Sequence, residues 1–577
     1  MFELRRELFP DAPDEERNRI PTVWTVRWWT CRPTTDYRMG KPVQRTQKKH
    51  MGENMSDMKD YQTEARKFLE EAREFRLGFL RSEARNPLTM NLDRDFATSS
   101  RQGVHTLLSC DTALLPLIRR IAASSDFYRL AESVKKCFAR GGRVIFSGCG
   151  ATGRLAILLE KAWREEFPGA EQVLSLQTGG DFALVRSVEN FEDYEMVGAL
   201  QLRELDATPA DLLIGITATG ETCSIFGSAL EAVRIGMEVF MLICVDPAEP
   251  AARLERCRKL YSSPSVHVLS MQVGPMALTG STRMQSSTVE LLFAAAALEQ
   301  AVFGETGIFS AYEEMLNALV SPAATAALAD SVDFESDIFR QGGLIDYQAE
   351  DLLIDLLSDT TERSPTFMIP PYHCSDAPAP EPWAMVRHPG AATPDAWRIC
   401  LGRNPRCISW TPETYRSAGL ADLLAKGLPR ISEGELMKIR IGNEEIPARK
   451  DAFSGRIVSE PSGVTLASGI RIPVPAAPVR LRMIEHLRMK LIMNTLSTGT
   501  MAKLGRICSN YMIYLDISNK KLVDRACRII SELCGLSYEE ACFELFRTRM
   551  DLPPGTSPVA LTLQRLQGVR KKVLPIF

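Results

Sequence analysis

Short apolar runs alternate with helical stretches across the first half of the chain. These runs occupy residues 143–148, 172–177, 211–217, 238–246 and 265–274. Several are nearly continuous in Val, Ile and Leu, which is typical of strands buried on both faces. The segments between them, such as 153–167 and 223–236, space their apolar residues as one face of a helix does. The alternation predicts an α/β fold in which helices cover both faces of a parallel sheet.

Helical spacing also dominates the flanks of this region. Residues 57–140 repeat apolar positions at i, i+3 and i+4, and a strongly apolar helix is predicted over 287–303. Residues 490–505 and 520–535 are amphipathic as well. Gly535 is placed to end the last of these helices, and Ser537 with Glu540 predicts a capping box for the next one.

An internal repeat indicates a duplicated unit. Residues 141–167 and 342–367 both contain Gly-Gly, a short apolar strand, a turn, an apolar helix and a final aromatic residue. Similar spacing over about 26 residues favours duplication over chance. The Pro-rich stretch 369–383 is predicted to be a loop.

Composition narrows the class of protein. The chain has 577 residues, of which 45% are hydrophobic and 24% charged, and its net charge is −3. This balance argues against a dedicated nucleic-acid binder. No apolar run approaches the ~20 residues that cross a bilayer, and the N-terminus lacks a secretory pattern. The 14 cysteines form no CxxC pair and the six histidines form no HxxxH, so we expect a cytoplasmic protein without membrane contact or metal.

Two glycine- and hydroxyl-containing turns follow predicted strands. Gly148, Gly150 and Gly153 formally fit G-x-G-x-x-G, but the next strand ends in Gln177 and Thr178 rather than an acidic residue, which argues against a dinucleotide. The second turn, 217–224, contains Thr219, Gly220 and Thr222. Backbone N–H groups, threonine hydroxyls and a helix start together favour capture of an anion. The alternative for each turn is an ordinary capped strand-to-helix connection.

Two further segments carry candidate polar groups. Glu189 follows a Gly-Gly turn and is otherwise an ordinary surface charge. Ser281 and Arg283 precede the apolar helix, where the arginine could bind a phosphate or sugar oxygen and where a helix cap is the competing interpretation.

Four segments together resemble the sugar-isomerase (SIS) domain of the N-acetylmuramic acid 6-phosphate etherases and the related glucokinase regulatory proteins. They are SGCGATGRLAIL (147–158), TGGDFALVRSVENFED (178–193), GITATGETCS (215–224) and VGPMALTGSTRM (273–284). Residues 84–93 and 490–526 resemble the entry segment and the C-terminal helical segment of the same group. The layout is similar to the regulatory proteins, which implies two SIS-type, flavodoxin-like domains in tandem with a helical C-terminal lid.

The sequence pattern, which shows no helical or strand period over residues 1–55, and the resemblance together suggest four regions. They are a poorly ordered extension (1–55), N-terminal helices with the first SIS domain (56–310), a degenerate second SIS domain (311–484) and a helical lid (485–577). In the second copy the phosphate turn is replaced by residues 348–351, whose two carboxylates would repel a phosphate. This leaves one ligand site, in the first domain and under the lid. Because the fused second copy could replace a partner subunit, we expect a monomer.

The resemblance also implies roles for individual residues. It suggests that the first turn (Gly150, Ala151, Thr152, Gly153) and the second (Thr219, Gly220, Thr222) hold the phosphate of a sugar phosphate. Ala151 departs from the usual hydroxyl. Glu189 would face the sugar ring, and the remaining implied ligands are Ser281, Arg283 and Lys490. No cofactor is implied.

Etherase chemistry needs an acid/base pair. One family carboxylate corresponds to Glu189, but the other corresponds to Ala162, and Glu165 lies one helical turn away. A carboxylate displaced by about 5 Å loses orders of magnitude in rate. We therefore favour a non-catalytic sugar-phosphate sensor or regulator whose partner could be a sugar kinase. An etherase-like lyase is the first alternative. A phosphosugar isomerase is the second, although the site segments contain no histidine to act as its base.

Overall fold

The computed structural model describes residues 50–188, 190–304, 307–444 and 452–569. The described residues from 56 onward belong to one compact unit. The expected extension over 1–55 falls almost entirely outside the described residues and stays a prediction. Helix α2 (His50–Glu71) begins within that range.

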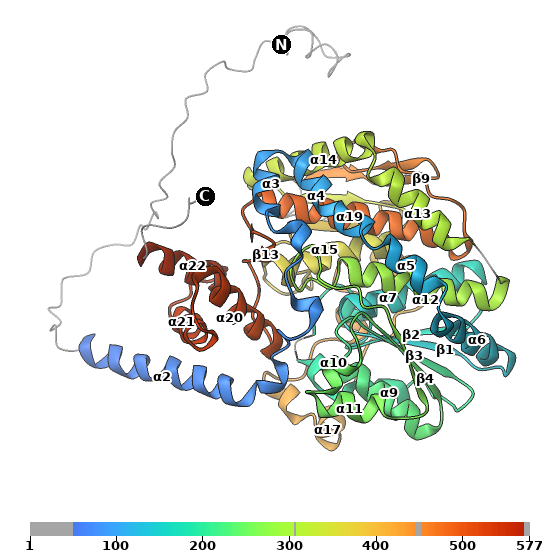
Figure 1. The fold of residues 1–577 in the computed structure, drawn as a ribbon, viewed down its shortest axis with the longest axis horizontal. Coiled ribbons are helices and arrows are strands. Elements are labelled where there is room, and N and C mark those ends of the chain that lie inside the picture. Colours follow the sequence, from blue (N-terminus) through green and yellow to red (C-terminus); the bar gives the residue numbers. More distant parts are fainter. Residues whose placement is uncertain (1–49, 189, 305–306, 445–451, 570–577) are drawn as a thin grey trace, which may run out of the picture. The chain divides into compact units, whose positions relative to one another are not determined.

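The first sheet has five parallel strands in the order β2-β1-β3-β4-β5 (Figure 1). Its strands are β1 (Val144–Gly148), β2 (Val173–Gln177), β3 (Leu212–Thr217), β4 (Glu238–Ile243) and β5 (Val266–Ser270). All five strands predicted from the sequence are therefore present. This strand order reverses direction beside β1 and β3, and ligands of such sheets bind at that switch point, beyond the carboxyl ends of the strands.

Helices cover both faces of this sheet because its strands bury side chains on both. Ile145 and Met241 pack under α8 (Glu195–Arg203), α9 (Cys223–Ile235) and α11 (Glu255–Tyr261). Phe146 and Leu242 point to the other face, which is covered by α6 (Ser125–Ala139), α7 (Ala151–Glu166) and α12 (Gln285–Phe303). Figure 1 shows the two helical layers on either side of the strands. The doubly wound α/β architecture is confirmed.

The predicted repeat folds as a second, smaller parallel sheet in the order β7-β6-β8. Its strands are β6 (Ile345–Gln348), β7 (Ala384–Arg387) and β8 (Phe453–Arg456), and helix α15 (Leu353–Phe367) follows β6. The order repeats the first three strands of the larger sheet, where β1 lies between β2 and β3. Asp351, in the turn after β6, pairs with Arg482, so its charge is balanced within the chain.

Buried ionic groups join the two sheets. Glu160 of α7 is fully buried and contacts Arg403 and Arg406, which follow α16 (Thr393–Leu401) of the second unit. Arg403 also binds both carboxylate oxygens of Asp181, at 2.6 and 3.0 Å. Glu160 belongs to the helix that precedes β2 and Asp181 lies after β2, so this cluster ties that edge of the larger sheet to the second half of the chain.

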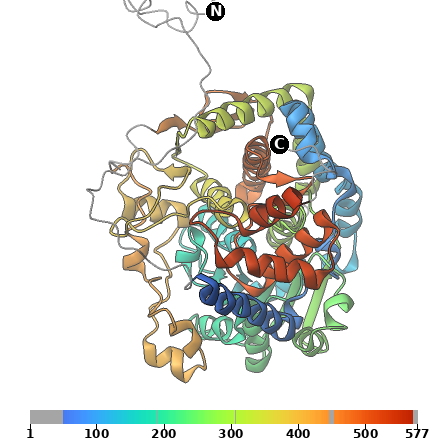
Figure 2. The ribbon, with the colours of Figure 1, turned by 90° about the vertical axis from the view of Figure 1, so that its left-hand side faces the viewer.

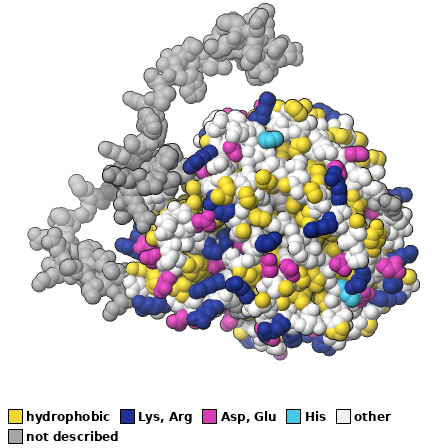
Figure 3. All heavy atoms as spheres, in the orientation of Figure 1, with side chains coloured by type: hydrophobic (Ala, Val, Ile, Leu, Met, Phe, Trp, Pro, Cys, Tyr) yellow, Lys and Arg dark blue, Asp and Glu magenta, His cyan; other side chains and the backbone are white. Residues whose placement is uncertain are grey.

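The C-terminal helices are α19 (Met483–Lys503), α20 (Lys520–Cys534), α21 (Tyr538–Met550) and α22 (Pro558–Val569). The capping box of Ser537 and Glu540 and the left-handed Gly535 are present as predicted. Ala65 of α2 packs in one core with Cys527 and Leu545, and Figure 2 shows α2 beside these helices. On the face in Figure 3, basic and acidic side chains are interspersed.

Among the described residues, α12 is the helix that by itself is long and apolar enough to span a membrane. Most of its apolar window, 78%, is buried inside the protein, as expected for a core helix. The expectation that no apolar stretch approaches that length was therefore too strict. Helices α13 (Ile308–Leu319) and α14 (Pro322–Arg340) pass the same test only as a pair, across a 65° bend.

Candidate functional site

A cavity of about 310 Å³ lies at the switch point of the first sheet. Its walls come from segments that are far apart in the chain: residues 149–154, 217–222, 280–283, 361–366 and 512–525. The two hydroxyl-containing turns therefore face one space, together with α15 of the second sheet and the start of α20. A cavity at the carboxyl edge of a parallel sheet is where α/β proteins place their ligands.

The first turn joins β1 to α7. Gly150 has φ of 56° and ψ of −122°, a conformation that favours glycine, and α7 begins directly after it. The Thr152 hydroxyl lies 3.0 Å from both the N–H and the carbonyl oxygen of Cys149, which holds the turn closed. Gly150, Ala151 and Thr152 line the cavity. The start of α7 therefore presents its free N–H groups at the cavity, as an anion site requires.

The second turn joins β3 to α9. Thr219 and Thr222 line the cavity, and Thr222 is the residue before α9. The Thr222 hydroxyl lies 3.0 Å from that of Thr217, and the Thr219 hydroxyl donates to Glu221 at 3.0 Å. Arg256 pairs with Glu221 at 2.7 Å, so this carboxylate is already compensated. Gly220, at φ of 65°, forms the bend but does not line the cavity.

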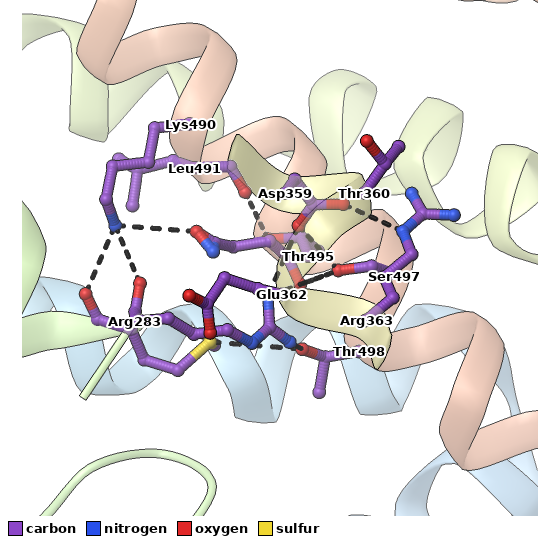
Figure 4. Close-up of polar contacts among 12 residues, drawn as sticks. Arg283, Asp359, Thr360, Glu362, Arg363, Lys490, Leu491, Thr495, Ser497 and Thr498 are labelled. Atoms are coloured by element: carbon purple, nitrogen blue, oxygen red, sulfur yellow. Dashed lines mark hydrogen bonds and ion pairs between the residues drawn. The ribbon is translucent and has the colours of Figure 1, made fainter. Parts of the chain in front are cut away.

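Arg283 and Lys490 contact each other, and Arg283 also contacts residues of α15 and α19 (Figure 4). Arg283 lines the cavity with Ser281, yet its guanidinium is buried against Asp359 at 3.2 Å and the Thr498 hydroxyl at 2.8 Å. The Lys490 amine donates to the carbonyl oxygen of Arg283 at 3.0 Å and lines a separate space of about 50 Å³. Burial lowers the pKa of Lys490 to about 8. The structure thus places Lys490 as a support of Arg283 rather than in the main cavity.

Basic groups from the C-terminal helix were missed by the sequence analysis. Lys521 and Arg525 of α20 line the cavity together with Asn519. Burial alone would lower the pKa of Lys521, but the carboxylates of Glu221 and Glu192 outweigh it and raise the pKa. The lysine is therefore charged at neutral pH, while 23% of its side chain stays exposed. The segment 490–526 had been linked to the ligand as a whole, yet a helical lysine without a turn motif gives no local signal.

A buried carboxylate fixes Arg525. Glu83, in the short helix η2 (Arg81–Glu83), binds Arg525 at 2.6 Å and Arg528 at 2.7 Å. Burial would raise the pKa of Glu83, but the two guanidinium groups outweigh it and lower the pKa to about 2. The N-terminal segment therefore holds one cationic wall of the cavity in place.

The charges around the cavity favour an anionic ligand. Among the described lining residues, five are basic and three are acidic. The basic residues are Arg154, Arg186, Arg283, Lys521 and Arg525. The acidic residues are Glu192, Glu362 and Asp516. Arg154 pairs with Glu362, Arg283 with Asp359 and Arg525 with Glu83, so Arg186 and Lys521 are the lining cations that remain to attract an anion.

The two proton-transferring groups that an etherase needs are not both found among the described residues that line the cavity. Glu189 lies outside the described residues, although its neighbours Val188 and Asn190 line the cavity. Ala162 is buried in the core of α7, and Glu165 pairs with Lys161 without lining the cavity. Glu165 is therefore not placed to replace a carboxylate at position 162. Burial and the neighbouring Glu192 raise the pKa of Asp193 to about 6, but Asp193 does not line the cavity either.

One group of side chains has the spacing of a metal site. Ligand atoms of Cys374, Asp376 and Glu435 lie within 4.8 Å of one another. Lys438 binds both carboxylates, at 2.8 and 2.7 Å, and Arg430 pairs with Glu435 at 2.6 Å. The carboxylates are therefore neutralised by side chains, which does not favour a metal ion.

Comparison with known proteins decides the family. The family model for the N-terminal SIS domain of glucokinase regulatory protein matches residues 129–233. N-acetylmuramic acid 6-phosphate etherase of Enterobacter sp. (strain 638) is 32% identical over 222 residues, which cover 37% of this chain and 68% of that protein. The chain belongs to the SIS-domain family of the N-acetylmuramic acid 6-phosphate etherases. The resemblance stated from the sequence is confirmed.

A second etherase relative matches the same share of the chain. N-acetylmuramic acid 6-phosphate etherase 2 of Vibrio cholerae serotype O1 is 34% identical over 220 residues. That match covers 37% of this chain and 66% of the relative, so the chain spans slightly less than two thirds of the relative's length. Among solved structures, tagatose-6-phosphate ketose/aldose isomerase from Escherichia coli aligns with 70% of this chain and 94% of its own, at 14% identity and a TM-score of 0.39.

Proposed function

We propose that this protein binds a phosphorylated sugar in the cavity at the switch point of the first sheet. One observation carries the proposal: the turns of Thr152 and Thr219–Thr222 come from neighbouring strands and line one space with a surplus of basic side chains. The phosphate would lie on the N–H groups at the starts of α7 and α9, where helix ends carry partial positive charge. Lys521 would compensate the remaining charge.

For the reaction, the curated relatives support an etherase-like lyase better than the regulator that the sequence analysis favoured. Such a lyase removes a proton from the sugar carbon next to the one that carries the ether, and it donates a proton to the departing lactate oxygen. Water then adds to the double bond, so the site needs two groups that transfer protons. Glu189 is the first candidate, on the strength of the family resemblance. Glu192, Glu362 and Asp516 line the cavity and are the available candidates for the second group.

One observation favours a regulator as the second candidate function. The helix position that corresponds to the second family carboxylate is Ala162, which is buried and cannot transfer a proton. The match to the regulatory protein's SIS domain agrees with this. In that case the bound sugar phosphate would favour one arrangement of the chain over another, and a sugar kinase would be the partner.

A single series of measurements separates these functions. Thermal-shift titrations with fructose 6-phosphate, fructose 1-phosphate and amino-sugar phosphates test binding, because a ligand at 100 times its Kd adds about 2.7 kcal/mol to stability. Incubation with N-acetylmuramic acid 6-phosphate and detection of lactate test the lyase. Lactate release by the wild-type protein that is lost in Thr219→Glu supports the lyase. A thermal shift without lactate supports the regulator, and no shift with any sugar phosphate refutes the proposed site.

A further inference from the structure

Three side chains that line the main cavity keep a buried polar atom without a partner. Among the described residues these atoms are the Arg283 Nε, the Thr361 hydroxyl and both amide atoms of Gln177. Buried polar groups in native proteins are almost always hydrogen-bonded, so each exception calls for an explanation. Gln177 is the most pronounced case, because it lacks a partner at its donor and at its acceptor although only 3% of the residue is exposed.

The position of the Gln177 side chain is fixed by its surroundings. It is the last residue of β2, and its backbone carbonyl accepts from the Gln201 side chain at 2.7 Å. The amide lies against Gly153 in the first turn of α7, where an added Cβ would come within 1.5 Å of the Gln177 Oε1. Glycine at 153 therefore leaves the space that the amide occupies. This also accounts for Gly153, which the sequence analysis had assigned to the phosphate and which does not line the cavity.

The chemistry of a free amide defines what it can bind. An amide offers one carbonyl acceptor and two N–H donors and carries no charge. The phosphate candidates, in contrast, are N–H groups and hydroxyls of the turns after β1 and β3, and cations of α20. The charged pair next to Gly153, Arg154 with Glu362, is internally balanced. The wall around Gln177 therefore suits an uncharged group that both donates and accepts hydrogen bonds.

We propose that Gln177 is a specificity-determining residue that hydrogen-bonds an uncharged hydroxyl or acetamido substituent of the sugar. This inference rests on the proposed function, because it concerns the non-phosphate part of the same ligand. It gives the two turns and Gln177 separate tasks: the turns bind the phosphate, and the amide selects among sugars that all carry one. A site built to pair with such a substituent discriminates strongly against ligands that lack it, since its own polar groups then stay unpaired.

The test compares the full-length protein with Gln177→Met, which keeps the size of the side chain and removes its hydrogen bonds. Calorimetric titration uses N-acetylglucosamine 6-phosphate, glucose 6-phosphate, 2-deoxyglucose 6-phosphate and inorganic phosphate. We expect Gln177→Met to lower the affinity for at least one sugar phosphate 10- to 100-fold. The affinity for inorganic phosphate should stay within threefold of the wild-type value. A loss confined to N-acetylglucosamine 6-phosphate identifies an acetamido group, and a loss shared with glucose 6-phosphate identifies a hydroxyl.

Stability of the unliganded protein separates this role from a structural one. Removing an unpaired buried amide should leave the Tm equal or higher in Gln177→Met, because its desolvation cost disappears. A lower Tm with unchanged affinity would assign Gln177 to folding and overturn the proposal. Gln172→Met, at the exposed residue directly before the same strand, is the matched control and should change neither quantity.

A second variant tests the geometry. Gly153→Ala places a methyl group where the Gln177 amide lies, so it should displace the amide and reproduce the selective loss of sugar affinity. Equal weakening of every ligand in Gln177→Met, inorganic phosphate included, would also overturn the proposal. If the wild-type protein binds none of the sugar phosphates, the proposed function fails first, and the titration of the unaltered protein reports that separately.

Discussion

Replacement of Glu160 by glutamine should destabilise the whole fold. Glu160 is fully buried, and its carboxylate accepts from Arg403 at 3.0 Å, from the Ser175 hydroxyl at 2.6 Å and from Arg406. Burial would raise its pKa, but the two guanidinium groups outweigh it and lower the pKa from 4.5 to about 2. The variant keeps the shape of the side chain and removes the counter-charge of Arg406, while Arg403 keeps only Asp181 as its ionic partner.

The size of the effect follows from that pKa. At 1.36 kcal/mol per pKa unit, the shift corresponds to about 3 kcal/mol. Loss of one partner from a buried ion pair costs a similar amount, about 3–5 kcal/mol. Because the folded pKa is lower than the unfolded value, this stability is complete above pH 4.5 and is lost as the pH falls towards 2. The difference between wild type and Glu160→Gln should therefore be largest at neutral pH and shrink below pH 4.5.

Urea denaturation at pH 7 and at pH 4, followed by circular dichroism, measures both quantities. Glu171→Gln is the matched control, because Arg164 approaches both Glu160, at 3.1 Å, and Glu171, at 3.9 Å, but the Glu171 side chain is 77% exposed. Exposed pairs contribute about 0–1 kcal/mol, so the control should unfold almost as the wild type does. Equal losses in the two variants, or a loss from Glu160→Gln that does not depend on pH, would refute the reasoning.

Three further predictions concern the cavity. Thr219→Glu should abolish any thermal shift with sugar phosphates, because it places a carboxylate among the phosphate candidates; a shift of wild-type size would count against the site. Lys521→Ala should lower the affinity for sugar phosphates at least tenfold, as measured by calorimetry. Lys520→Ala should not, because the Lys520 amine lies over the Phe75 ring and does not line the cavity. Glu83→Gln should lower the Tm and weaken binding together, because it releases Arg525, and unchanged binding would show that this arginine needs no anchor.

Local patterns in the sequence were enough to predict the sheet. Each strand of the first sheet is a run of apolar residues whose alternate side chains enter the two cores, so composition and period carry the signal. The turns at Gly150 and Thr219 were predictable for a similar reason, since glycine and hydroxyl residues directly after a buried strand have few structural alternatives. The domain boundaries, and the roles of individual site residues, stay predictions.

What the sequence did not reveal depends on contacts between distant segments. Lys521 and Arg525 lie on an ordinary amphipathic helix, and only packing against Glu83 and Glu221 directs them to the cavity. Lys490 resembles a phosphate ligand by its place in the segment, but buried carbonyl oxygens provide a nearer partner. No local pattern distinguishes a lysine that faces a ligand from one that supports an arginine.

The last wall of the cavity is also the last to be synthesised. Glu83 and Arg525 are separated by 442 positions, and α20 begins about 240 residues after Arg283. At 5–20 residues per second, a ribosome needs about 10–50 s to cover that interval. During this time the nascent chain has the strands and turns of the first sheet but lacks the wall that α20 supplies. A metabolite that fits this cavity can therefore stabilise the finished polypeptide, but it cannot assist the early steps of its folding during translation.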